Sequence, residues 1–177
     1  MMRISLISNP PYNMKWDIPP FAANQNRFNK CELPPESNAN FAFILTALEK
    51  VSSKAVFLLP CSVLNGGLKQ EQEIRKYLIE KNLIEAVITC PNNMFESTGI
   101  ATCIIVFNKY KKTQQVEFVD MRNTYDEEER EQRGQYGNKS HTNRVYKKKI
   151  AIFNDEQIEK AINAVKNHVT EKGFAIS

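Results

Sequence analysis

An α/β fold is predicted for this chain, because short apolar runs with strand character alternate with amphipathic helical segments. The strand-like runs are residues 3–8, 54–59, 84–89, 102–108 and 116–120. Two segments between these runs show the helical spacing of apolar residues, 41–52 and 69–82. Strands that alternate with helices usually build one sheet with the helices packed against its faces.

Local signals support the individual elements. Residues 41–52 place apolar side chains at i, i+3, i+4 and i+7 from Ile44, and Asn40 precedes them as a candidate helix cap. Residues 69–82 show the same spacing. Residues 13–39 are rich in Pro and Asn and are predicted to form a loop.

The composition changes after Asp120, so residues 121–177 are predicted to form a charged loop and a helical extension. The mixed charge run 126–133 is most simply a solvated helix. The basic stretch 139–149 favours a solvated surface loop over a strip that contacts DNA phosphates.

A final helix is predicted after Asn154, which has capping-box spacing to Gln157. Its apolar residues are expected to form one packing stripe: Ile158, Ala161, Ile162, Val165 and Val169. His141 and His168 are expected at the surface, because no metal-ligand spacing surrounds them.

Length, net charge, cysteine spacing and the longest apolar run limit the kinds of protein that this chain can be. The 177 residues suit one domain, and the net charge of +4 permits nucleic-acid contact without requiring it. The four cysteines have no C-x-x-C spacing, which favours buried free thiols in a reducing cytoplasm over a metal site or disulfides. No apolar run approaches the roughly 20 residues that cross a membrane. We therefore expect a cytoplasmic protein.

The turn Asn9-Pro10-Pro11-Tyr12 at the end of the first strand carries the main chemical signal. It resembles the active-site loop of amino-group methyltransferases, above all the adenine-N6 DNA methyltransferases. Their substrate, the exocyclic adenine amine, is a poor nucleophile, because its lone pair is delocalised into the ring. The Asn9 side-chain carbonyl and the Pro10 main-chain carbonyl can accept its hydrogens and favour a pyramidal nitrogen. Two prolines make the turn rigid, and the Tyr12 ring can stack on a flipped base. The alternative is an ordinary Pro-rich turn.

Further motifs follow in a fixed order along the chain. The segment 64–67 reads Leu-Asn-Gly-Gly, 73–78 reads Glu-Ile-Arg-Lys-Tyr-Leu, and 98–109 reads Thr-Gly-Ile-Ala-Thr-Cys-Ile-Ile-Val-Phe-Asn-Lys. With the Asn-Pro-Pro-Tyr turn, their order and spacing from about residue 4 to 111 resemble the methylase subunit of type I restriction-modification systems. That subunit more often carries Phe at the position of Tyr12.

This resemblance implies that residues 1–120 are the C-terminal half of a Rossmann-like, S-adenosylmethionine-dependent catalytic domain that methylates adenine N6 in DNA. In the implied mixed sheet, strand 3–8 lies beside 54–59, and 102–108 is the one antiparallel strand, between 54–59 and 84–89. Partners would be DNA and the specificity and restriction subunits.

The resemblance also implies a set of site residues. Catalysis would fall to Asn9, Pro10 and Tyr12. Substrate binding would involve Pro11, Lys15 and Phe95, an aromatic residue that packs against the other face of the flipped base. Phe95 could instead be a core residue that anchors its loop.

The cofactor-binding half of such a domain is expected to be missing. None of the six glycines makes a G-x-G turn after a strand, and the Asn-Pro-Pro-Tyr turn begins at residue 9. We therefore expect no tight binding of S-adenosylmethionine by this chain alone. The edge of strand 3–8 would need a cover: a second copy, a separate N-terminal half-domain, the 13–39 loop or the C-terminal helix.

Other functions stay open at this point. One alternative is a methyltransferase that acts on a protein glutamine amide, whose side-chain NH₂ poses the same chemical problem as the adenine amine. Such enzymes use a similar motif, although the segment 91–109 favours the DNA family. A catalytically silent assembly module would only bind partners, and cofactor binding separates it from the enzymes.

Overall fold

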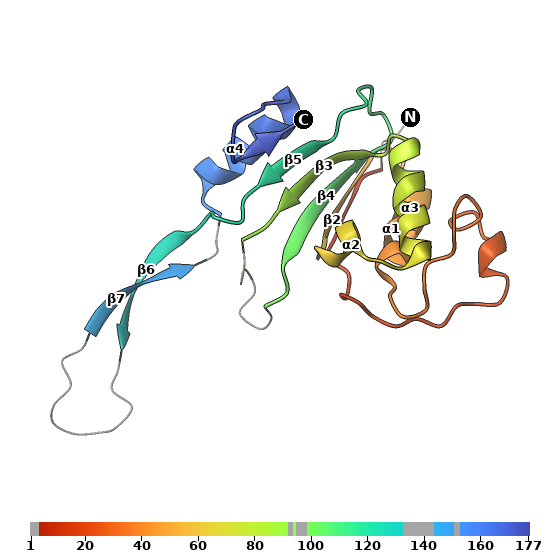
Figure 1. The fold of residues 1–177 in the computed structure, drawn as a ribbon, viewed down its shortest axis with the longest axis horizontal. Helices are drawn as coiled ribbons and strands as arrows, with labels where there is room; N and C mark the ends of the chain where they lie inside the picture. Colours follow the sequence, from red (N-terminus) through yellow and green to blue (C-terminus); the bar gives the residue numbers. More distant parts are fainter. Residues whose placement is uncertain (1–3, 92–93, 95–98, 133–143, 151–152) are drawn as a thin grey trace, which may run out of the picture.

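The structure is a computed structural model of the chain, and it describes residues 4–91, 94, 99–132, 144–150 and 153–177. Its main feature is a six-stranded mixed sheet in the order β1-β2-β4-β3-β5-β8 (Figure 1). The strands are β1 (Leu6–Ser8), β2 (Lys54–Pro60), β3 (Ile84–Thr89), β4 (Thr102–Asn108), β5 (Glu117–Asp120) and β8 (Ala175–Ile176). No helix within the described ranges is long and apolar enough to cross a membrane.

The order of the first four strands in the sheet confirms the prediction. Strand β1 pairs in parallel with β2, and β4 runs antiparallel to its neighbours β2 and β3. Strand β5 lies parallel beside β3, which confirms the short strand predicted at 116–120. The prediction of one antiparallel strand was incomplete, because β8 also pairs antiparallel, with β5. A two-residue strand is too short to leave a periodic pattern in the sequence.

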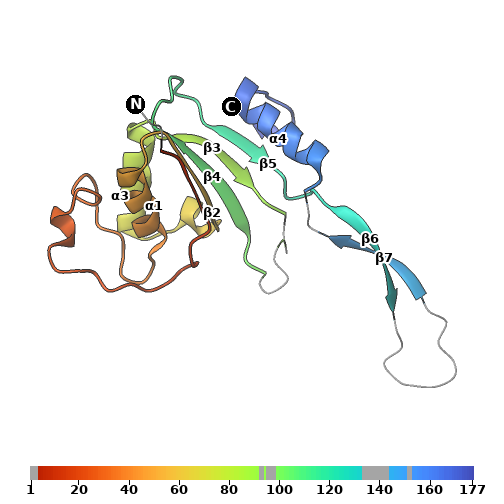
Figure 2. The same ribbon diagram turned by 180° about the vertical axis from the view of Figure 1, so that it is seen from behind.

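Three helices cover one face of the sheet: α1 (Asn40–Lys50), α2 (Ser62–Asn65) and α3 (Lys69–Glu80) (Figures 1 and 2). Helices α1 and α3 confirm the helical patterns at 41–52 and 69–82. The rings of Phe57 and Phe107 meet edge to face in the core beneath them, with centroids 6.1 Å apart. Ile44 of α1 and Ile74 of α3 are fully buried in the same core.

Helix α4 (Asp155–Asn167) packs against the other face of the sheet, near β3 and β5. The register shows this, because Ile88 of β3 points away from the α1–α3 core and joins a second cluster with Val119. Ala161 and Ala164 of α4 belong to that cluster, together with Met121 and Ala175. The predicted capping box is confirmed: Asn154 accepts a hydrogen bond from the Gln157 amide, and the Gln157 side chain accepts one from the Asn154 amide.

The apolar stripe predicted for this last helix is only partly correct. Ala161 is buried and Val165 packs against the cluster, but Ile158 and Ile162 remain 41% and 38% exposed. The helix turns its alanine side toward the sheet, where small side chains allow a close approach, and the larger isoleucines lie at the margin.

His168 is exposed, as the sequence predicted, and it also contacts the sheet. It ends α4 in the left-handed conformation, with φ 52°. Its Nδ1 lies 2.5 Å from Oε1 of Glu117, a residue of β5 that is fully buried. The end of α4 is therefore tied to the sheet by a polar contact between residues that lie far apart in sequence.

The helix predicted at 126–133 is wrong. This segment forms strand β6 (Asp126–Gln132), which pairs antiparallel with β7 (Arg144–Ile150) and projects away from the main sheet (Figure 1). The register places Glu127, Glu128 and Glu129 opposite Lys149, Lys148 and Lys147, respectively. Opposite charges across a strand pair stabilise it. The basic run of β7 lies opposite the acidic run of β6, and this arrangement favours a strand over a solvated helix.

Strand β1 forms one edge of the sheet. Within the described part of the chain, no strand pairs with its outer side. Ile7, which shares a face with Val56 and Val106, is 87% exposed. Helix α4, one of the covers considered from the sequence, packs at the far end of the sheet, beside β5.

Candidate active site

The Asn9–Tyr12 turn follows β1 directly and lies at the carboxyl edge of the parallel strands. The neighbouring strand ends are joined at this edge by backbone hydrogen bonds, from the Cys61 amide to the Ala101 carbonyl (2.8 Å) and from the Cys90 amide to the Thr102 carbonyl (2.9 Å). Ligands of open α/β sheets bind outside the carboxyl ends of the strands. The turn therefore stands where a substrate would approach.

The residues of the turn differ in their exposure to solvent. Asn9 and Pro11 are exposed, Pro10 is buried and Tyr12 is half-buried. Lys15, which follows in the loop, is exposed as well. The buried ring of Pro10 anchors the turn, while the side chain of Asn9 remains accessible from solvent.

Tyr12 directs its hydroxyl group into the protein. The oxygen is buried and has no hydrogen-bond partner among the described residues. Burial raises the pKa of Tyr12, and the nearby thiols of Cys90 and Cys103 raise it further. The phenol is therefore neutral near neutral pH, and its hydroxyl lies in apolar surroundings that would suit a phenylalanine ring equally well.

Replacing Tyr12 by phenylalanine is expected to stabilise the fold by about 1 kcal/mol, because it removes a buried hydroxyl without a partner and keeps the ring. Urea unfolding of the two proteins, followed by circular dichroism, measures the difference. Tyr77→Phe is the control on α3. A clear loss of stability in Tyr12→Phe would show that the hydroxyl has a partner.

Three thiols gather beneath this edge. Cys90 and Cys103 are buried, Cys61 is half-buried, and all three are free. Burial raises the pKa of all three thiols, that of Cys90 to about 11. The thiols therefore remain protonated at neutral pH and act as apolar packing, as the sequence predicted. The described residues contain no cluster of His, Cys, Asp or Glu that could hold a metal ion.

The loop that follows the turn is held by specific contacts that the sequence did not reveal. Asn13 adopts a left-handed conformation with φ 51°, and the Met14 carbonyl accepts a hydrogen bond from the Ala39 amide (2.8 Å). The Trp16 indole N–H donates to the Pro35 carbonyl at 2.9 Å. Trp16 therefore packs within this loop in the structure.

The structure thus brings the predicted residues Asn9, Pro10, Pro11 and Tyr12 together at one strand end, with Lys15 in the loop beyond. Phe95 lies outside the described residues. The contacts missed from sequence are those of the polar side chains beneath the turn, Asn38, Asn40 and Glu71. No local pattern indicates them, because their partners lie far away in the sequence.

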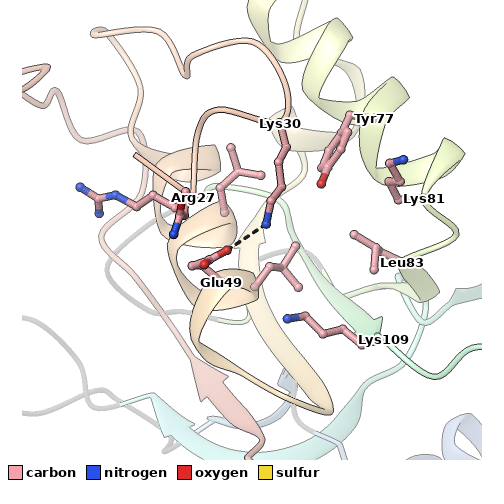
Figure 3. Close-up of a pocket in the computed structure, with 10 residues that line it drawn as sticks. Arg27, Lys30, Glu49, Tyr77, Lys81, Leu83 and Lys109 are labelled. Atoms are coloured by element: carbon pink, nitrogen blue, oxygen red, sulfur yellow. Dashed lines mark hydrogen bonds and ion pairs between the residues drawn. The ribbon is translucent and has the colours of Figure 1, made fainter. Parts of the chain in front are cut away.

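A cavity of about 330 Å³ lies at the opposite end of the sheet, between the final turns of α1 and α3 (Figure 3). Leu45, Leu48 and Leu83 form its apolar part. Basic side chains surround it, but Lys30 already pairs with Glu49 at 3.1 Å. Because this cavity adjoins the amino ends of β2 and β3, it is separate from the Asn9–Tyr12 turn.

The described residues do not fit a complete site for a nucleoside cofactor. None of the glycines in the described ranges directly follows a strand: Gly66 and Gly67 come after α2, Gly99 precedes β4, and Gly173 precedes β8. The acidic side chain at the end of β5, Asp120, is already bound by Arg122 at 2.6 Å, which lowers its pKa well below the usual range.

Comparison with known proteins identifies the family. The model of the N-6 DNA methylase family matches residues 2–177. The chain belongs to this family. Over 97% of its length it is 36% identical to the methylase subunit of the type I restriction enzyme MpnII from Mycoplasma pneumoniae. It is 28% identical over 72% of its length to the MjaIX methylase subunit from Methanocaldococcus jannaschii.

This N-6 DNA methylase chain spans less than a third of those curated relatives, 29% and 24% of their lengths. Among solved structures, it superposes on the methyltransferase subunit of a type I restriction-modification system from Streptococcus thermophilus, with a TM-score of 0.78 and 30% identity. That match covers 97% of this chain and 33% of the other. The predicted α/β, Rossmann-like methyltransferase fold is thereby confirmed.

Proposed function

We propose that this chain is the target-base half of a DNA adenine-N6 methyltransferase in a type I restriction-modification system. The observation that carries the proposal is the Asn9–Tyr12 turn at the carboxyl edge of the sheet, in a chain whose family match spans residues 2–177. Its partners would be DNA and the specificity and restriction subunits. A cytoplasmic location suits that role.

The turn has the groups that an adenine amine requires. The Asn9 side-chain carbonyl and the Pro10 main-chain carbonyl accept the two amine hydrogens and favour a pyramidal, more nucleophilic nitrogen. The buried Pro10 ring fixes φ at that residue and stiffens the turn that carries both acceptors. No strong base is needed first, because the amine sheds its proton after methylation.

The neighbouring residues would hold the base and the DNA strand. Tyr12 offers a ring for stacking, Phe95 would pack against the other face of the base, and Pro11 would line the base pocket. Lys15 is exposed and would contact the target strand. S-adenosylmethionine is the methyl donor that the family implies, and we propose that a half-domain beyond the described residues holds it.

The isolated chain is expected not to bind S-adenosylmethionine tightly. The reason is that none of the glycines in the described ranges directly follows a strand, and that Asp120 is already paired with Arg122. Isothermal titration calorimetry of the chain with S-adenosylmethionine measures this directly. Binding at micromolar concentration would contradict the proposed division of the domain.

The enzyme itself is tested by supplying the cofactor-binding half of a family member, either as a second chain or fused before β1. Methylation of adenine in double-stranded DNA supports the proposal. Methylation of a glutamine-containing protein but not of DNA would favour the glutamine-amide alternative. If the complex forms but neither binds S-adenosylmethionine nor methylates either substrate, the chain is an assembly module.

A further inference from the structure

A fully buried asparagine lies directly beneath the Asn9–Tyr12 turn. Asn40 is the first residue of α1 and has no exposed surface. Its side chain was predicted to cap the helix, but its Oδ1 accepts a hydrogen bond from the Asn13 amide (3.1 Å), and its Nδ2 donates to Asn13 Oδ1 (3.0 Å). Burying a polar side chain is unfavourable unless it forms hydrogen bonds. The two bonds to Asn13 therefore compensate for the burial of the Asn40 side chain.

Asn13 is the residue that ends the turn. Its φ of 51° lies in the left-handed region, which asparagine tolerates better than most residues. The two bonds to Asn40 hold both its backbone and its side chain. Because Asn13 follows Tyr12 directly, its conformation determines the direction in which the chain leaves the turn.

The polar contacts continue below the turn. Asn38 Oδ1 accepts a hydrogen bond from the Asn40 amide (3.0 Å), and Asn38 Nδ2 donates to Glu71 Oε1 (3.1 Å). Glu71 of α3 is 4% exposed, and burial raises its pKa. A Cβ added at Gly66 would lie 2.2 Å from Glu71 Oε2, so the carboxyl group rests against the loop that joins α2 to α3.

We propose that Asn40 and Asn13 are positioning residues, and that the chain Asn13–Asn40–Asn38–Glu71 fixes the Asn9–Tyr12 turn relative to the α2–α3 loop. The proposal rests on the proposed function, in which that turn accepts the amine hydrogens. These residues contact no substrate; they act by holding Asn9 and Pro10 in the geometry that accepts the amine.

Substitutions at Asn13 separate the hydrogen bond from the backbone conformation. Asn13→Gly accepts the positive φ readily but lacks Oδ1, whereas Asn13→Asp keeps an acceptor for Asn40 Nδ2. In the complemented enzyme, Asn13→Gly and Asn40→Ala are expected to lower kcat about 10- to 100-fold. Asn13→Asp is expected to keep kcat close to that of the unchanged enzyme.

Amide hydrogen exchange of this chain tests the same network without any catalytic assay. In Asn40→Ala the Asn13 amide is expected to exchange about 10- to 100-fold faster, while the amides of β2 and β4 keep their rates. Uniformly faster exchange would indicate global destabilisation and overturn the positioning role. Asn163→Ala is the matched control, because it removes an exposed bond to Asn167 on α4.

The distant end of the network offers a second pair of variants. Gly66→Ala would push the Glu71 carboxyl group away from Asn38, whereas a Cβ at Gly67 meets nothing within 4 Å. Faster exchange of the Asn13 amide in Gly66→Ala, but not in Gly67→Ala, supports the network.

Two outcomes separate this inference from the proposed function. An Asn13→Gly enzyme with full kcat, or an unchanged Asn13 amide in Asn40→Ala, overturns the positioning role. If the unchanged complemented enzyme methylates nothing, the proposed function fails, and the exchange rates still decide whether the network holds the turn.

Discussion

Replacing Asn9 by alanine is expected to lower DNA adenine methylation by about 10²–10³-fold in the complemented enzyme, because one of the two acceptors for the amine hydrogens is lost. The side chain is exposed, so the substitution leaves no cavity, and the fold should keep its stability. Incorporation of labelled methyl groups into a DNA duplex, measured at saturating DNA, gives the effect on kcat.

Two further variants sharpen this test. Asn9→Asp retains a side-chain acceptor and is expected to keep more activity than Asn9→Ala. Asn29→Ala removes another exposed asparagine, farther along the same loop, and should leave methylation unchanged. Full activity of Asn9→Ala would show that this side chain has no part in the chemistry.

The central sheet could be predicted because its signals are local. β2, β3 and β4 are apolar runs, and α1 and α3 carry helical spacing. The capping box at Asn154 is another short-range pattern, and it is present in the structure. The sheet order came from the family resemblance, since local patterns carry no information on which strands pair.

The elements that sequence reasoning missed depend on distant partners. The mixed charge run of β6 predicts a solvated helix, but the segment pairs with β7, which lies farther along the chain. The two residues of β8 form a strand because β5 offers a free edge. Such pairings depend on residues far apart in sequence, which periodicity within one segment cannot detect.

The candidate site was likewise predicted only where its signals are local. The Asn9–Tyr12 turn could be found from residue types and its place after a strand. The sequence predicts helix capping for Asn40, the ordinary role of an asparagine at that position. Its actual bonds to Asn13 span 27 residues, and no local pattern reveals them. The burial of the Tyr12 hydroxyl near Cys90 and Cys103 also involves residues far along the chain, so the turn by itself could not predict it.

The isolated chain is expected to associate through the outer edge of β1. No described strand pairs with that edge, and Ile7 is 87% exposed on the face of the sheet away from α1. Unpaired backbone groups beside apolar side chains favour pairing with another strand. A second copy of the chain, or a separate cofactor-binding half-domain, would each supply it.

Light scattering over a range of concentrations should therefore show a mass that rises above that of one chain. Ile7→Lys is expected to weaken this association by about tenfold or more, because a charged side chain is costly to bury in an apolar interface. Ile79→Lys is the matched control, since Ile79 is 60% exposed on α3.

Adding the cofactor-binding half should shift the chain from self-association to a one-to-one complex, because both partners compete for the same edge. Amide exchange of Leu6–Ser8 should slow in either assembly. A chain that stays monomeric at every concentration, with rapidly exchanging amides along β1 and no complex with the added half, would show that this edge is stable without a partner.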